Sequence, residues 1–226
     1  MFSLDRGNVY HAQPLDELTW LKHGFGTRLS SGWPDTTGLA TLRQNHSDKI
    51  LAADRAGCIG EGDALITATP GIALAVRTAD CLPILMADPR NQAVAAVHAG
   101  WRGTLAGIVP KTVQAMQQQF GTRPQELVAA IGPGIGWCCF EVGPEVAEQF
   151  IPWFPERSDL SGRARIDLVE TIERQLRRYA VTMRHLATAS LCSCCKPDLF
   201  HSYRRDHEAA GRMVSMIRIE TPKARD

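Results

Sequence analysis

The stretch CLPILMADPRNQAVAAVHAG, residues 81–100, contains two apolar runs separated by a group of turn-forming residues. Such runs, bounded by turn signals, are typical of buried β-strands. In 81–87 both the odd-numbered and the even-numbered residues are apolar, which predicts a central strand covered on both faces. Pro83 counts against a central position, because a proline removes one donor from the hydrogen-bond ladder. We nevertheless predict two adjacent strands at 81–87 and 93–99.

The connection between these strands predicts which side chains face each other. Proline at the second position of Asp88-Pro89-Arg90-Asn91 favours a tight turn. If Asp88 pairs with Asn91, seven residues back along each strand lie Cys81 and His98, directly opposite each other. Opposed Cβ atoms lie about 4.5–5.5 Å apart, which suits two ligands of one metal or a thiol with its base. A bulge or a longer loop would break this register.

The rest of the chain alternates strand and helix signals. Apolar runs predict further strands, and helical spacing predicts a helix over 104–120, which Gly121 ends and Pro110 either kinks or delays. Asp167 is a plausible cap for another helix. The further strands are expected at 64–67, 72–77, 127–132, 181–188 and 212–219, and the further helices at 144–151 and 167–180. We therefore predict one layered α/β (α+β) domain over 1–226, with mixed sheet layers covered by helices.

Charge composition limits the class of partner. The 25 Lys and Arg residues nearly balance the 24 Asp and Glu residues, so no global field attracts nucleic acid or an anionic membrane. A small polar substrate is the better expectation. Residues 1–18 contain no apolar run long enough for a signal peptide or a membrane helix, so we expect a cytoplasmic protein.

Seven cysteines in a reducing compartment indicate thiols, metal ligands or a nucleophile rather than disulfides. Cys81 and His98 need a third ligand to form a metal site. His46 is the best candidate, because it lies in a polar stretch just upstream of the strand block. Two histidines and one cysteine suit zinc, and three protein ligands leave a fourth position for water or substrate.

Five motifs carry a resemblance to a known family: GDALIT (62–67), RTADCLPIL (77–85), AAVHAGWRGTLAGIV (95–109), IGPGIGWCCFEVGPEV (131–146) and FHSYRRD with GRM (200–213). Together they resemble the laccase-domain family, also known as peptidoglycan editing factor, polyphenol oxidase or purine nucleoside phosphorylase. The resemblance implies a zinc, sometimes copper, site at His46, Cys81 and His98. Ser47 stands where the family commonly has glycine, whereas the spacing from Gln44 to His46 is intact. The implied fold is similar to the deamidase domain of a bacterial cytotoxic necrotising toxin.

The resemblance also implies activities. The family is associated with phosphorolysis of adenosine, inosine and methylthioadenosine, and with adenosine deamination, which zinc suits because it acidifies bound water. Arg102 is the expected phosphate contact, since a guanidinium binds phosphate oxygens in bidentate fashion. We expect Trp101 and Gln44 to contact substrate as well, although a tryptophan beside a glycine-rich turn more often packs in the core. Arg77 and Arg204 are further anion candidates or ordinary surface arginines.

Two acidic residues have two interpretations each. Asp63 and Asp80 either act in catalysis, by orienting histidine ligands or accepting a proton from a substrate hydroxyl, or they have structural roles. In the structural interpretation Asp63 caps a turn and Asp80 binds backbone groups. The sequence does not separate these interpretations.

Other functions compete with nucleoside chemistry. An amidohydrolase that edits cytoplasmic cell-wall precursors could use zinc, or Cys81 as nucleophile with His98 as base. A non-enzymatic, metal-stabilised binding module predicts a closed four-ligand site. Oxidase activity is the weakest candidate, because the several His-x-His pairs of multi-copper sites are absent from the sequence. A rival zinc site is CSCC (192–195) with His201 and His207, whereas Cys138 and Cys139 are expected to be small buried packing residues.

Overall fold

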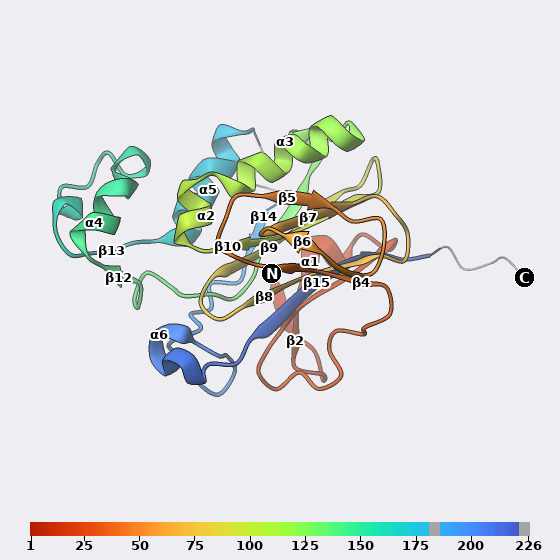
Figure 1. The fold of residues 1–226 in the computed structure, drawn as a ribbon, viewed down its shortest axis with the longest axis horizontal. Helices are drawn as coiled ribbons and strands as arrows, with labels where there is room; N and C mark the ends of the chain where they lie inside the picture. The colour runs from red at the N-terminus through yellow and green to blue at the C-terminus, as the bar shows by residue number, and fades with distance from the viewer. Residues whose placement is uncertain (181–185, 222–226) are drawn as a thin grey trace, which may run out of the picture.

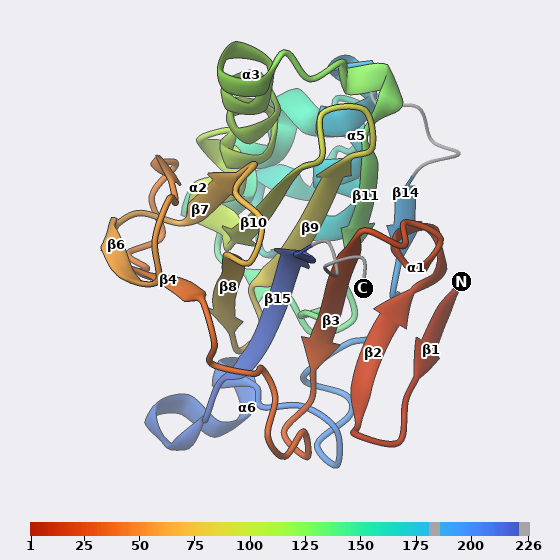
Figure 2. The same cartoon turned by 90° about the vertical axis from the view of Figure 1, so that its right-hand side faces the viewer.

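The computed structural model describes residues 1–180 and 186–221, which form two mixed β-sheets and a layer of helices (Figure 1). We call the six-stranded sheet the inner sheet, because it lies between the seven-stranded outer sheet and the helices (Figure 2). In spatial order the inner sheet comprises β14 (Leu186–Thr188), β11 (Val128–Ile131), β9 (Leu82–Asp88), β10 (Ala93–Ala99), β7 (Ala64–Thr67) and β5 (Ile50–Ala52).

The outer sheet is formed by both ends of the described chain and by the strands near residue 40 and residue 75. Its spatial order is β1 (Phe2–Leu4), β2 (Val9–Ala12), β3 (Leu21–Gly26), β15 (Met213–Ile219), β8 (Ala73–Thr78), β4 (Leu39–Arg43) and β6 (Gly57–Glu61). A small pair comprises β12 (Glu141–Val142) and β13 (Ala164–Arg165). The helices are α1 (Gln13–Asp16), α2 (Trp101–Leu105), α3 (Ile108–Phe120), α4 (Pro144–Ala147), α5 (Leu168–Arg178) and α6 (Tyr203–Asp206).

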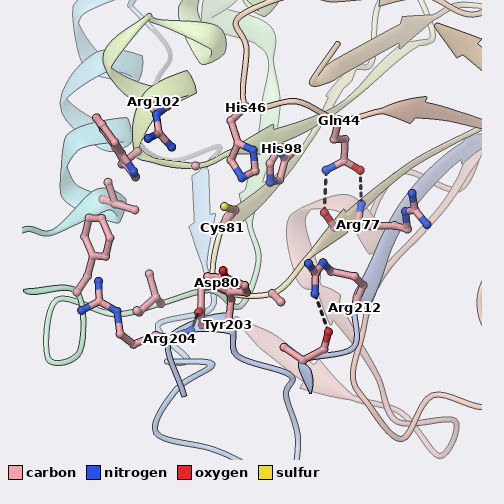
Figure 3. Close-up of a pocket in the computed structure, with 17 residues that line it drawn as sticks. Gln44, His46, Arg77, Asp80, Cys81, His98, Arg102, Tyr203, Arg204 and Arg212 are labelled. Carbon is pink, nitrogen blue, oxygen red and sulfur yellow. Dashed lines mark hydrogen bonds between the residues drawn. The ribbon is translucent and has the colours of Figure 1, made fainter. Parts of the chain in front are cut away.

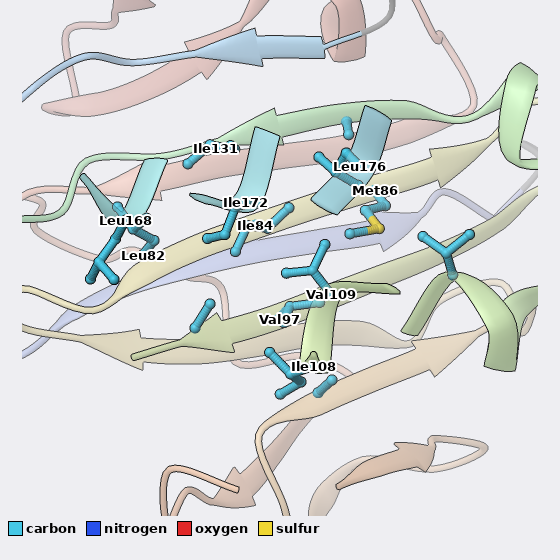
Figure 4. Packing of buried hydrophobic residues seen from close by; sticks show 14 of the residues in the cluster. Leu82, Ile84, Met86, Val97, Ile108, Val109, Ile131, Leu168, Ile172 and Leu176 are labelled. Atoms are coloured by element: carbon cyan, nitrogen blue, oxygen red, sulfur yellow. The ribbon is translucent and has the colours of Figure 1, made fainter. Parts of the chain in front are cut away.

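The central strand β9 contributes to two cores, as its two apolar faces predict. Leu82, Ile84 and Met86 pack with residues of α3 and α5 on the helical side of the inner sheet (Figure 4). Leu85 and Ala87 point the other way, into the core between the two sheets. The mixed α/β layers and the central position of β9 are therefore confirmed.

Pro83 is tolerated in this central strand because of its position. It is the second residue of β9, and its carbonyl oxygen still accepts a hydrogen bond from the Gly132 N–H at 2.9 Å. The proline therefore costs the inner sheet one donor at the end of the ladder, where the neighbouring strand β11 also ends.

The predicted helix over 104–120 is wrong as a single element. The structure has α2 and α3 instead, separated at Gly107, whose φ of 77° lies in the left-handed region that glycine adopts without strain. Pro110 falls in the first turn of α3, where no intrahelical donor is lost. Gly121 ends α3 with a φ of 69°, as expected.

The other predicted elements are mostly confirmed. Asp167 caps α5 by accepting a hydrogen bond from Glu170 N at 2.9 Å. The expected helix over 144–151 is only one α-helical turn, α4, followed by a 3₁₀ segment at Glu148–Trp153. Of the strand expected over 181–188, residues 181–185 lie outside the described residues and 186–188 form β14. No helix in the described part of the chain has the length and hydropathy that crossing a bilayer needs.

Candidate active site

Three side chains from separate elements meet at one end of the inner sheet. His46 lies in the loop after β4, Cys81 directly precedes β9, and His98 is near the end of β10. Their nitrogen and sulfur ligand atoms all lie within 4.8 Å of one another (Figure 3). His46 is exposed, Cys81 is half-buried and His98 is buried. The group therefore has one open side.

The strand register that predicted Cys81 directly opposite His98 was wrong. Asp88 pairs with Ala93, not with Asn91, so that His98 stands opposite Pro83. The connection is longer because the Asp88 carboxylate accepts hydrogen bonds from the N–H groups of Arg90 and Asn91, at 2.9 and 3.2 Å. The shift amounts to two residues, and a shift of two keeps every side chain on its original face.

Because of this shift, Cys81 and His98 lie diagonally across the two strands rather than directly opposite each other. Gly100 leaves the room that this arrangement needs. In the shifted register it occupies the place across from Cys81, and a Cβ there would lie 2.9 Å from Cys81 Sγ and 3.0 Å from His46 Cδ2. A Cβ at that distance from the sulfur would force an atom to shift, and the contact with the His46 ring would be tighter than most Cβ contacts. A glycine at this position therefore leaves the space that the thiol and the imidazole occupy.

Asp63, at the start of β7, links two of the three candidate ligands. Its buried carboxylate accepts hydrogen bonds from His46 N at 3.0 Å, from Ser47 N at 2.7 Å and from His98 Nδ1 at 2.7 Å. Ser47 Oγ donates a further bond at 2.7 Å. His46 has a φ of 61°, a left-handed conformation that these bonds to the loop hold in place. Asp63 thus combines loop capping with an orienting contact to His98.

The pKa values follow from these contacts. Burial opposes ionisation of Asp63, but hydrogen bonds from His98 and Ser47 outweigh burial and lower its pKa to about 2. Burial also disfavours the His98 imidazolium, yet the contacts to Asp63 and Cys81 raise its pKa to about 9. Burial also disfavours the Cys81 thiolate. The contacts with His46 and His98 outweigh burial and lower the thiol pKa to about 7. The site therefore stabilises a Cys81 thiolate near neutral pH.

The residues fit a zinc or copper ion by their chemistry. A thiolate and two imidazoles form a borderline-soft donor set, and both metals accept it. Because Asp63 binds Nδ1 of His98, the other ring nitrogen is left to face Cys81. Such a carboxylate–histidine contact is the usual second partner of a metal-bound histidine.

The open side faces a pocket of about 860 Å³. Four arginines line it, Arg77, Arg102, Arg204 and Arg212, and the one acidic residue among the lining residues is Asp80 (Figure 3). Arg102 lies 4.4 Å from the centre of the Trp101 ring and forms no salt bridge with any described residue. The pocket is therefore suited to an anionic group beside the three candidate ligands.

Asp80 holds the wall of this pocket. Its carboxylate accepts hydrogen bonds from Ser193 Oγ at 2.6 Å and from Arg204 N at 2.7 Å, and its backbone oxygen accepts one from Ile135 N at 2.7 Å. The residue has a φ of 89°, which these three bonds stabilise. The observed contacts of Asp80 are thus with the protein itself, as the structural interpretation expects.

Gln44 and Trp101 both line the pocket, but each also makes structural contacts within the protein. The Gln44 amide donates to Arg77 O at 2.8 Å and accepts from Arg77 N at 2.9 Å, so it extends the contact between β4 and β8. Trp101 is partly buried against the core beneath α2. Their roles toward substrate remain predictions, as do those of Asp63, Asp80 and Arg102.

The sequence interpretation gave no role to Arg212 and Tyr203, which also line the pocket. Both lie in the FHSYRRD and GRM motifs, which carried the resemblance and so contained a signal. The chain segment from β14 to β15 brings them beside β9, more than 120 positions from Cys81 in sequence. Local pattern alone gives no means of placing them there.

Known proteins share these features of sequence and fold. A purine nucleoside phosphorylase of Bacteroides thetaiotaomicron is 42% identical over 163 residues, which cover 70% of this chain but only 60% of that relative. A protein named adenosine deaminase RL5, from an unknown prokaryotic organism, is 36% identical over 199 residues, or 81% of this chain and 76% of its own.

The solved structure of YlmD from Geobacillus stearothermophilus superposes with a TM-score of 0.87 at 26% identity, and covers 97% of this chain and 99% of its own. Residues 27–220 match the family described as multi-copper polyphenol oxidoreductase laccase. That match includes all three candidate ligands, Asp63 and the four pocket arginines. The chain belongs to this laccase-domain family.

Proposed function

We propose that this protein is a metal-dependent purine nucleoside phosphorylase that acts on adenosine, inosine and methylthioadenosine and also deaminates adenosine. One observation carries the proposal: the three ligand atoms of His46, Cys81 and His98 open into an arginine-lined pocket. The names of the similar proteins, purine nucleoside phosphorylase and adenosine deaminase, support both reactions.

His46, Cys81 and His98 would hold the metal, which we propose is zinc. A metal bound there would supply Lewis acidity at its fourth coordination position. Cys81 contributes negative charge, since its thiol pKa is lowered to about 7. Asp63 keeps a proton on Nδ1 of His98, so that the second ring nitrogen is available as a ligand.

The phosphate would be bound by an arginine of the pocket. In phosphorolysis a phosphate oxygen forms a bond to the anomeric carbon of the ribose while the bond from that carbon to the purine nitrogen breaks. The electron pair leaves with the base, which then takes up a proton. Arg102 would bind the phosphate oxygens, because it lines the pocket beside Trp101 and forms no salt bridge with any described residue. Trp101 would contact the purine ring.

A second candidate function is hydrolysis of an amide in a cell-wall precursor. The contacts of Cys81 with His46 and His98 favour it, because a thiol pKa of about 7 gives a nucleophilic thiolate without any metal. His98 would then protonate the leaving amine, since its own pKa is raised to about 9. The two candidates differ in their need for a metal and for phosphate.

The deciding experiment measures metal content by mass spectrometry together with adenosine turnover, with and without phosphate. The phosphorylase predicts formation of adenine and ribose 1-phosphate that requires phosphate and stops after chelation. Inosine formed equally with and without phosphate, with no adenine released when phosphate is present, would assign deamination alone. Nucleosides left unchanged by the metal-loaded protein would overturn the proposal. The next substrates to test would then be precursor amides, and inertness toward those as well would favour a metal-stabilised binding module.

A further inference from the structure

A second group of sulfur atoms lies away from Cys81. Cys138 and Cys139 follow β11, Cys192 and Cys195 follow β14, and all four Sγ atoms lie within 4.8 Å of one another. The expectation of buried packing is confirmed in part for Cys139, which is partly buried against the core, but it is wrong for Cys138, which is exposed. The expected grouping of the CSCC segment with His201 and His207 is also wrong, because Cys192 and Cys195 lie beside Cys138 and Cys139 instead. The reason is the parallel pairing of β11 with β14, which brings the two following loops together.

The distances within this thiol cluster suit one tetrahedral ion. Cys195 Sγ lies 3.3 Å from Cys139 Sγ and 3.6 Å from Cys138 Sγ. A zinc–sulfur bond of about 2.3 Å implies sulfur–sulfur distances of about 3.8 Å around a tetrahedral zinc ion. Four sulfur ligands from two short loops are the usual composition of a closed, structural zinc site.

The surroundings also favour a cation between the sulfurs. Gly136 N donates a hydrogen bond to Cys192 Sγ at 3.2 Å, as backbone groups do to a thiolate. Four thiolates this close together would repel one another, and a divalent soft cation among them supplies the positive charge that offsets this repulsion.

We propose that Cys138, Cys139, Cys192 and Cys195 bind one structural zinc ion, distinct from the metal of the active site. Binding converts the thiols to thiolates and releases their protons to solvent, with no change of oxidation state. The ion would join the two loops directly beside the pocket wall, because Ser193, between two of the ligands, donates to Asp80. Its structural role would thus be to hold the wall on which Asp80 and Arg204 meet.

The test isolates this site from the other. In a Cys81→Ser background, reduced protein loaded with zinc and passed through a desalting column should retain one zinc per chain. Adding Cys195→Ser should remove that zinc, whereas adding Cys194→Ser should leave it, since Cys194 is the adjacent thiol outside the cluster. Equal zinc in all three variants, or none in the Cys81→Ser protein, would overturn the proposal.

A measurement on the unmodified chain covers the case in which a variant does not fold. Cobalt(II) added to the reduced, metal-free wild-type protein should bind in two equivalents. One of them should show the intense sulfur-to-cobalt absorption of four thiolate ligands. A single equivalent, with the weaker absorption of one thiolate, would overturn the cysteine site while leaving the His46, Cys81 and His98 site intact.

Discussion

His98 Nδ1 donates a 2.7 Å hydrogen bond to the buried Oδ1 of Asp63, and the same oxygen accepts the backbone N–H of His46 at 3.0 Å. One carboxylate thus positions two candidate metal ligands that are 52 residues apart in the chain. The first prediction follows from this bridge.

Replacing Asp63 with asparagine should weaken metal binding by about 10- to 100-fold, because the amide is a poorer acceptor for His98 and for the loop amides. Competition with a chromogenic chelator measures the affinity, and circular dichroism verifies the fold. Asp54→Asn is a matched control, since Asp54 is exposed and its carboxylate pairs with the neighbouring Arg55. An unchanged affinity in Asp63→Asn would show that the bridge does not orient the ligands.

Cys81→Ser should abolish phosphorolysis and metal binding at the His46, Cys81 and His98 site, since a serine hydroxyl is a much poorer zinc ligand than a thiolate, so that the zinc content falls from two per chain to the one of the cysteine cluster. His46→Ala should behave in the same way. The exposed Cys58 gives the control Cys58→Ser, for which we expect wild-type metal content and rate. If Cys81→Ser kept the wild-type zinc content but lost turnover, the thiol would be a nucleophile rather than a ligand, and this outcome would support the hydrolase interpretation.

Arg102→Ala should raise the KM for phosphate by about 10- to 100-fold, because a charge-assisted hydrogen bond contributes about 1.5–3 kcal/mol. Deamination of adenosine uses no phosphate and should keep its KM. Steady-state kinetics with each substrate varied separates these effects. Arg55→Ala removes a surface arginine outside the pocket and serves as the control. Equal losses in both reactions would argue against a specific phosphate contact.

His23 predicts a loss of stability in acid. The ring is buried and its Nε2 accepts the Ala12 N–H at 2.9 Å. Burial, with repulsion from His11, lowers its pKa to about 3, below the value near 6.5 of an unfolded histidine. The unfolded state therefore binds the extra proton between those pH values, and folding stability falls as the pH drops through this window.

The contribution of this one group is at most about 1.4 kcal/mol per pH unit. Urea unfolding at several pH values should show a flatter dependence below pH 6.5 for His23→Gln than for wild type. His207→Asn changes an exposed histidine instead and should retain the wild-type slope. Parallel pH profiles for His23→Gln and wild type would contradict the assignment.

Ile84 tests the burial of β9 on its helical side. It is fully buried between the inner sheet and the helices, so Ile84→Ala should lower the free energy of unfolding by about 2–5 kcal/mol, and Ile84→Val by about 0.5–1.5 kcal/mol. Urea denaturation gives both values. Leu29→Ala, at a residue that is 51% exposed, should change stability little. A small effect at Ile84 would mean that the core rearranges around the cavity.

The short strands near the start of the chain were not predicted from the sequence, and all of them except β5 belong to the outer sheet. The strands at 64–67, 81–87 and 93–99 were predicted because burial on both faces leaves continuous apolar runs. No strand was predicted in the first 60 residues, although six begin there. Those strands have three to six residues each and several are exposed on one side, so their local pattern is weak.

The sequence by itself determined three features: the two apolar faces of β9, the cap of α5 and the types of donor atom at His46, Cys81 and His98. These depend on near neighbours, through alternation, turn formation and the chemistry of single side chains. Tertiary structure alone decided the two-residue register shift, the contacts of Asp63, the placement of four arginines around one pocket and the meeting of Cys138 with Cys195. Each of these depends on contacts between segments distant along the chain, which form only when strands pair and the sheets pack against each other.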